Sequence, residues 1–271
     1  MSRISGCFEQ LKANGRKALI PYLTAGDPDT GTTLALMHAL VANGADIIEL
    51  GYPFTDPTSD GPVIQRAVER ALKNHTSLRD TLEIVRAFRT TNSDTPVVLM
   101  GYLNPVECMG YQDFTDAAVA AGVDGVLIVD MPPEESHDLK VLLDQTSLDS
   151  IFLVAPTTSD VRARRICEQS KGYVYYVSLK GVTGAGHLDI ASVQENLARV
   201  RASTDLPVGV GFGIKDAVSA RQIAGIADAV VVGSALVSLI AELEPGKTWE
   251  QEALQSRIGL IREMREAMDA A

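Results

Sequence analysis

Residues 208–214 read VGVGFGI and residues 230–237 read VVVGSALV, and these two stretches decide the fold class. Each begins as a short aliphatic run and passes into glycine, which is typical of a buried parallel strand that ends in a tight turn. An open doubly wound sheet usually carries its glycine fingerprint after the first strand, where this chain reads TAGDPD at 24–29. A barrel often binds phosphate after its seventh and eighth strands. The glycine distribution therefore favours a closed (β/α)8 TIM barrel.

The rest of the chain supplies the other strands of that barrel. Short apolar runs alternate with segments of helical period, a pattern typical of parallel strands joined by crossover helices. We expect eight strands, near residues 18–23, 46–50, 97–102, 125–129, 150–154, 173–177, 207–211 and 228–232. Helical patterns between them include 32–42, 112–121, 161–169 and 217–224. No long linker divides the chain, so residues 1–271 are predicted to form a single barrel domain.

The longest interval between strands follows the second strand. It contains a loop at 51–61 and two predicted helices, at 63–73 and 78–90. Extra chain at this point suggests that function was built there. Two more helices are predicted outside the repeat, an additional N-terminal helix at about 4–13 and a C-terminal one at 250–268.

The composition excludes several classes of function. The formal net charge is −11, with 35 acidic and 24 basic residues and no long basic cluster, so nucleic-acid binding is not expected. The longest uncharged run, 229–241, is shorter than the roughly 20 apolar residues of a membrane span, and the N-terminus has no secretory apolar stretch. Cys7, Cys108 and Cys167 are an odd number without a C-x-x-C pair, which indicates a reducing compartment. We therefore expect a cytoplasmic protein with no membrane contact.

Two carboxylates near the second strand are the candidate catalytic groups. Glu49 ends an otherwise apolar strand in ADIIELG (45–51), where a desolvated glutamate gains the raised pKa that proton transfer near neutral pH requires. A glutamate in a salt bridge at the barrel rim is the equal alternative. Asp60 follows in a proline-stiffened loop, although it or Gly61 could simply cap the helix that starts at Pro62.

The glycines after the last three strands indicate an anion site. Gly209, Gly211 and Gly213 end the seventh strand, Gly233 and Ser234 open a helix after the eighth, and GVTGAG at 181–186 follows the sixth. Backbone N–H groups in a glycine turn and at a helix N-terminus bind phosphate without a lysine. Tight strand–helix packing is the better explanation for any one of these loops, but three on consecutive strands favour phosphate. The four histidines have no i,i+4 partner, so no metal site is expected.

Seven stretches, spread in order along the chain, carry a resemblance to a known family. They are 21–28 (PYLTAGDP), 47–67 (IIELGYPFTDPTSDGPVIQRA), 97–106 (VVLMGYLNPV), 122–136 (GVDGVLIVDMPPEES), 175–186 (YYVSLKGVTGAG), 208–214 (VGVGFGI) and 230–237 (VVVGSALV). Over nearly the whole barrel, the chain resembles the α subunit of tryptophan synthase. One departure is Thr58-Ser59, where the family more often has an apolar and then a small residue. This departure leaves both carboxylates, Glu49 and Asp60, in place.

The resemblance implies a lyase that cleaves indole-3-glycerol phosphate to indole and glyceraldehyde 3-phosphate by a retro-aldol reaction. Glu49 would be the general acid/base and Asp60 would hold the indole N–H. The remaining site residues implied by the resemblance bind phosphate or line the substrate pocket: Tyr175, Thr183, Gly184, Phe212, Gly213, Gly233 and Ser234, with Leu99, Leu127 and 151–153 as further indole-pocket walls.

The resemblance also implies a partner, the tryptophan synthase β subunit, in an α2β2 assembly. No cofactor is expected in this subunit, and pyridoxal phosphate would belong to the β partner. The loop 53–60 and Asn104-Pro105 would face that partner. Two rival interpretations are a Schiff-base aldolase that uses Lys180 and an inactive barrel that only activates its partner.

Overall fold

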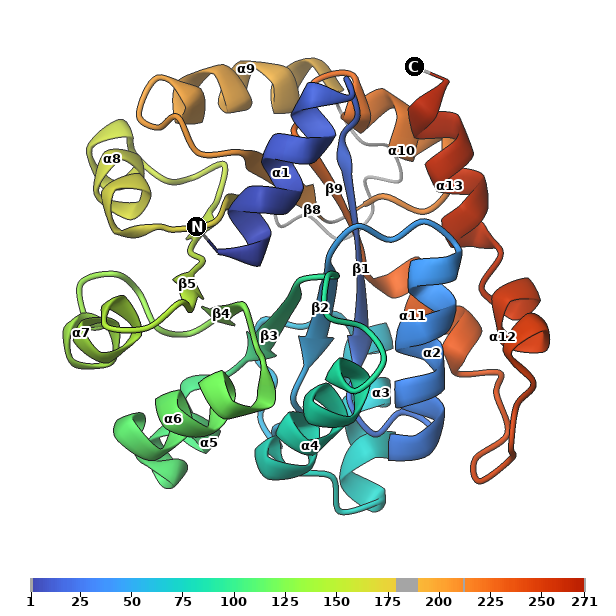
Figure 1. Cartoon of the computed structure of the whole chain (residues 1–271). Coiled ribbons are helices and arrows are strands. Elements are labelled where there is room, and N and C mark those ends of the chain that lie inside the picture. The colour runs from blue at the N-terminus through green and yellow to red at the C-terminus, as the bar shows by residue number, and fades with distance from the viewer. Residues whose placement is uncertain (1, 179–189, 212, 271) are drawn as a thin grey trace.

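Nine parallel strands form one curled sheet in the computed structural model, which describes residues 2–178, 190–211 and 213–270 (Figure 1). The strands are β1 (Ala18–Thr24), β2 (Ile48–Gly51), β3 (Val97–Gly101), β4 (Gly125–Ile128), β5 (Asp149–Ser150), β6 (Leu153–Val154), β7 (Val174–Val177), β8 (Val208–Gly211) and β9 (Ala229–Val232). Their order in the sheet is β5-β4-β3-β2-β1-β9-β8-β7-β6. The predicted strands therefore form, although the second begins two residues later than expected.

The predicted fifth strand, 150–154, is divided into β5 and β6. Ser150 of β5 pairs with β4, whereas Leu153 of β6 pairs with β7. Between them, Ile151 donates its N–H to β4 and Phe152 accepts one from β7. This extended segment thus joins the two ends of the sheet and closes the ring. The predicted (β/α)8 barrel is confirmed, with a fifth strand that changes partner halfway along.

The described residues form 13 helices, most of which surround the strands (Figure 1). They are α1 (Arg3–Ala13), α2 (Thr30–Ala42), α3 (Pro62–Lys73), α4 (Leu78–Arg89), α5 (Leu103–Met109), α6 (Tyr111–Ala121), α7 (His137–Asp144), α8 (Asp160–Gln169), α9 (Ile190–Arg201), α10 (Ala217–Ala224), α11 (Ser234–Ile240), α12 (Gln251–Arg257) and α13 (Leu260–Asp269). No helix in these ranges is long and apolar enough to cross a membrane.

The prediction of one C-terminal helix over 250–268 is wrong, because the chain forms α12 and α13 with a break at Ile258 and Gly259. Glycine is a poor helix former. In addition, the Asn43 side chain donates to the carbonyls of Gln255 (2.9 Å) and Ile258 (3.3 Å) and so satisfies the end of α12. Sequence periodicity does not reveal a cap supplied by Asn43, the residue that follows α2.

Two apolar layers build the barrel. The outer layer lies between strands and helices, and the inner layer fills the barrel itself with side chains such as Ile47, Val98 and Leu127. Ile4 and Phe8 of α1 belong to the inner layer, so the predicted N-terminal helix closes the barrel at the end where the strands begin (Figure 1). The opposite end, where the strands finish, is the end that carries active sites in such barrels.

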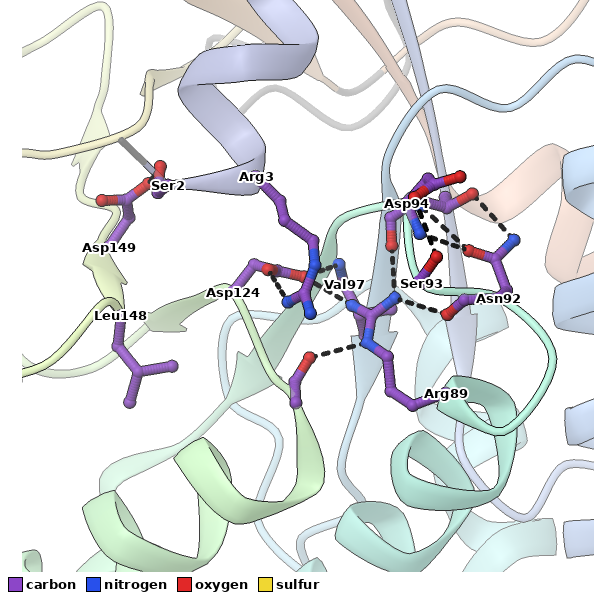
Figure 2. A network of polar contacts seen from close by, with 12 residues as sticks. Ser2, Arg3, Arg89, Asn92, Ser93, Asp94, Val97, Asp124, Leu148 and Asp149 are labelled. Atoms are coloured by element: carbon purple, nitrogen blue, oxygen red, sulfur yellow. Dashed lines mark hydrogen bonds and ion pairs between the residues drawn. The ribbon is translucent and has the colours of Figure 1, made fainter.

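Aspartates that precede strands hold neighbouring strands together at the closed end of the barrel, where the strands begin. Asp46, Asp124 and Asp228 each stand shortly before a strand and accept the backbone N–H of a residue at or near the start of the neighbouring strand, at 2.8, 2.8 and 3.0 Å. Asp124 also pairs with Arg3 of α1 at 2.7 Å and with Arg89 of α4 at 2.5 Å (Figure 2). Its carboxylate is 3% exposed, so these contacts satisfy a charge that water cannot reach.

We expect Asp124→Ala to lower the free energy of unfolding by about 3 kcal/mol, because it leaves the largely buried Arg89 guanidinium (side chain 11% exposed) without its carboxylate. Urea unfolding followed by circular dichroism measures the change. Asp94 is an exposed aspartate in the same network (Figure 2), and the free energy of unfolding of Asp94→Ala should stay within about 0.5 kcal/mol of wild type. Equal midpoints for the two variants would show that the network does not stabilise the barrel.

Candidate active site

Glu49 lies inside the barrel with its side chain fully buried. The Tyr173 hydroxyl donates to Glu49 Oε1 at 2.5 Å, while Oε2 has no hydrogen-bond partner among the described residues. Burial raises the pKa of Glu49 from 4.5 to about 7, although the Tyr173 hydrogen bond lowers it in part. No described lysine or arginine pairs with this carboxyl, so the rim salt bridge does not account for it among those residues. A carboxyl with such a pKa is able to take up and release a proton near neutral pH.

Asp60 lies in the loop that leads from β2 into α3. Gly61 is the N-cap residue of α3 and Pro62 is its first residue, so the Asp60 carboxylate does not cap the helix. It instead accepts a hydrogen bond from the Tyr102 hydroxyl at 3.1 Å. Burial raises the pKa of Asp60 to about 6, and the Tyr102 bond opposes that rise. Asp56, in the same loop, is exposed, and its carboxylate accepts a hydrogen bond from the Thr55 hydroxyl of the same loop.

The two carboxyls act on the same buried tyrosines. Both raise the pKa of Tyr22 and of Tyr175, besides the larger effect of burial on each phenol. Because electrostatic effects decline with distance, Glu49 and Asp60 both lie near this pair. Tyr22 stands beside Glu49 in the register of β1 and β2. The structure therefore brings together three residues predicted from sequence, Glu49, Asp60 and Tyr175.

Tyr102 and Tyr173 were missed by the sequence interpretation. Tyr173 does carry a signal, since it is two residues before Tyr175 and so lies on the same face of a strand. Tyr102 follows β3 and reaches Asp60 across 42 positions of sequence. Only the folded barrel shows that contact.

Two strand-end glycines make room for tyrosines. A Cβ atom at Gly51 would lie 2.2 Å from the Tyr22 hydroxyl oxygen, and one at Gly211 would lie 1.9 Å from that of Tyr175. Both distances are far below any van der Waals contact, so glycine is required at both positions. The packing explanation therefore holds for Gly211, which the sequence interpretation had grouped with the phosphate glycines.

The expected phosphate residues are partly described. Gly213 has a φ of +77°, a conformation that favours glycine, and Gly233 is the N-cap of α11. Ser234 begins that helix, is exposed, and has no acidic residue in its turn. The first N–H groups of a helix have no intrahelical acceptor, so they are available to an anion. Thr183, Gly184 and Phe212 lie outside the described residues, as does Lys180.

The predicted pocket walls divide between the two layers. Leu127, Ile151 and Leu153 pack in the inner layer of the barrel together with Tyr173, whose hydroxyl donates to Glu49. Leu99 and Phe152 belong to the outer layer and face the helices. Neighbouring residues of a strand point to opposite faces, which is why Leu99 and Phe152 do not line the interior. Among the described residues, no group of three histidine, cysteine, aspartate or glutamate side chains is arranged to hold a metal.

Comparisons with known proteins agree on one family. The sequence profile described as "Tryptophan synthase alpha chain" matches residues 8–269. The tryptophan synthase alpha chain of Thioalkalivibrio sulfidiphilus is 60% identical over 269 residues, which cover 99% of this chain and 100% of the relative.

Solved structures give the same result. Tryptophan synthase subunit alpha from Legionella pneumophila is similar with a TM-score of 0.90 and 45% identity, and the match covers 100% of both chains. A chain of the aminoacrylate-bound tryptophan synthase of M. tuberculosis matches with a TM-score of 0.86 and 38% identity over 99% of this chain and 100% of that one. This chain therefore belongs to the tryptophan synthase alpha chain family.

Proposed function

We propose that Glu49 and Asp60 perform the chemistry of this carbon–carbon lyase. The α subunit of tryptophan synthase cleaves indole-3-glycerol phosphate by a retro-aldol reaction, which gives indole and glyceraldehyde 3-phosphate. The observation that carries the assignment is a fully buried carboxyl with a pKa of about 7 near a second carboxyl with a pKa of about 6. Paired carboxyls with unlike surroundings suit unlike roles in one reaction.

Glu49 is the proton-transfer residue in this proposal. Cleavage breaks the bond between indole C3 and the glycerol chain, so a proton must reach C3 and another must leave the glycerol hydroxyl that becomes the aldehyde. One carboxyl with a pKa near neutrality serves both transfers. Tyr173 holds Oε1 in place, and Oε2 remains available to the substrate.

Asp60 is the group that stabilises charge. Protonation of C3 places positive charge on the indole nitrogen, and a carboxylate that accepts the N–H hydrogen bond stabilises that charge. With a pKa of about 6, Asp60 is mainly ionised at neutral pH. Tyr102 holds Oδ2, which leaves Oδ1 for the indole.

The phosphate of the substrate is assigned to the loops after the last three strands, at Gly184, Gly213, Gly233 and Ser234. Helix α11 supports this assignment, because its N-terminus follows β9 at the catalytic end. The net charge of −11 means that attraction of the anionic substrate must be local. Tyr175, Thr183 and Phe212 are proposed to contact the rest of the substrate.

The partner is proposed to be a tryptophan synthase β subunit, in an α2β2 assembly. Asn104 and half of loop 53–60 (Thr55, Asp56, Thr58 and Ser59) support this, since they are exposed and follow strand ends on the catalytic side. The retro-aldol step balances with proton transfers alone, so we assign pyridoxal phosphate to the β subunit. Cys7, Cys108 and Cys167 are unpaired, which supports a reducing compartment such as the cytoplasm. We also infer that residues 1–271 fold as a single domain.

Glu49→Gln should lower kcat by about 100-fold or more, because glutamine cannot transfer a proton. Indole release from indole-3-glycerol phosphate measures this, with and without a β subunit. The fold should persist, since the amide removes a buried charge. Glu107→Gln, an exposed glutamate on α5, is the matched control and should turn over like wild type. Near-wild-type release of indole by Glu49→Gln would remove its assigned role.

The dependence of kcat/KM on pH should show the protonation of Asp60. We expect kcat/KM to fall as pH drops through about 6, because protonated Asp60 no longer stabilises positive charge on indole. The Tyr102 hydrogen bond lowers the pKa of Asp60, so Tyr102→Phe should move this acid limb to higher pH.

The matched control for that shift is Tyr111→Phe, because the Tyr111 hydroxyl donates to Glu107 on the surface. Its acid limb should coincide with that of wild type. An acid limb that stays in place in Tyr102→Phe would mean that Asp60 does not control it.

A further inference from the structure

Asp27 is a buried charge that the proposed chemistry does not use. It follows β1 at the catalytic end of the barrel and its side chain is 1% exposed. Arg70 of α3 donates to both of its oxygens, from Nε to Oδ1 at 2.7 Å and from Nη2 to Oδ2 at 2.8 Å. Such a two-pronged contact fixes direction as well as distance. It therefore joins the first loop of the barrel to α3 in one orientation.

A second contact joins the same loop to the end of α3. Asn74 is the C-cap residue of that helix, and its side-chain amide donates to the carbonyls of Gly26 (3.2 Å) and Pro28 (2.5 Å). The loop is itself tightly placed, because a Cβ atom at Gly26 would lie 2.1 Å from the Thr76 hydroxyl oxygen. The polar contacts of Arg70 and Asn74 thus hold the C-terminal half of α3.

The N-terminal end of α3 carries Asp60. Only Gly61 separates Asp60 from Pro62, the first residue of the helix, so any shift of α3 moves this carboxyl. Along its length α3 packs on β1 and α11 through apolar side chains such as Ile64 and Val68. Apolar packing is non-directional, so it leaves the rotation and axial position of a helix less defined than a two-pronged ion pair does.

Strand β1 is the common reference for both catalytic carboxyls. Its residue Tyr22 pairs with Glu49 in the sheet, and the loop that follows it holds α3 through Asp27. We propose that Asp27 and Arg70 are positioning residues that set the place of Asp60 relative to Glu49. This inference rests on the roles proposed above for the two carboxyls.

Stability alone is a poor explanation of the pair. Removing two charges from water offsets most of their attraction, so a buried ion pair often adds little net stability. What it does supply is fixed geometry, and a displacement of about 1 Å in an active site can lower a rate by about 100-fold. The pair is also at the end of the barrel where geometry matters to the reaction.

The first test is Asp27→Asn, which keeps the shape of the side chain and removes its charge. We expect kcat to fall about tenfold, with KM within about threefold of wild type, because the contact between Asp60 and indole strengthens in the transition state. The matched control is Asp124→Asn, a buried aspartate paired with arginines at the closed end. It should lose stability and keep the wild-type kcat.

The decisive readout is the combination with Asp60→Asn. If Asp27 acts through Asp60, the effects of the two substitutions are not additive. Asp27→Asn should then change kcat less than about twofold when it is introduced into the Asp60→Asn variant. An equal loss in both backgrounds, or an unchanged kcat in the Asp27→Asn single variant, overturns the inference. Arg70→Lys, which keeps the charge and loses the two-pronged geometry, repeats the test if Asp27→Asn does not fold.

The same set of variants separates this inference from the proposed function. Wild-type turnover in Asp60→Asn would remove the role of Asp60, and the inference with it. A full loss in Asp60→Asn together with additive effects of Asp27→Asn would remove only the inference.

Discussion

The burial of one carboxyl, that of Glu49, is the constraint on which the rest of the structure depends. An ionised carboxylate inside a barrel is unfavourable by several kcal/mol unless it is paired, and among the described residues Glu49 has only the Tyr173 hydroxyl as a partner. At neutral pH the ionised and the neutral form of Glu49 are therefore close in free energy, in keeping with its pKa of about 7. The apolar inner layer and α1 beneath it maintain that balance, because they keep water from the strand starts.

Among the residues that the structure describes, tyrosines rather than cations hold both carboxyls. A lysine or arginine beside a carboxylate would lower its pKa and leave it ionised throughout the reaction. A phenol donates one hydrogen bond and remains neutral, so Tyr173 and Tyr102 fix one oxygen each without removing the capacity to take up a proton. The mouth of the barrel accommodates such large rings because glycine ends neighbouring strands, as Gly51 does beneath Tyr22.

The sequence was sufficient to predict the barrel and to single out Glu49 and Asp60 as candidates, and its limits have physical reasons. Strand and helix patterns are local, so eight strands could be placed to within two residues, but the division of the fifth depends on which neighbour each half meets. The choice between Asp60 and Gly61 as helix cap could not be made from sequence, since either residue type suits that position. Tyr173 lies 124 positions from Glu49, and no periodicity encodes a hydrogen bond over that distance.

Charged pairs have different consequences at the two ends of the barrel. At the closed end, Asp124 binds a strand start and two arginines, all of which belong to elements already fixed by the sheet and the inner layer. Its contribution is to satisfy buried polar groups, and a change there alters stability more than shape. At the catalytic end the chain leaves the sheet, so the positions of loops and of α3 are set by whatever side chains reach them. The two-pronged contact between Asp27 and Arg70 matters there because it fixes the orientation of α3, and with it the position of Asp60, the proposed catalytic carboxyl beside the start of that helix.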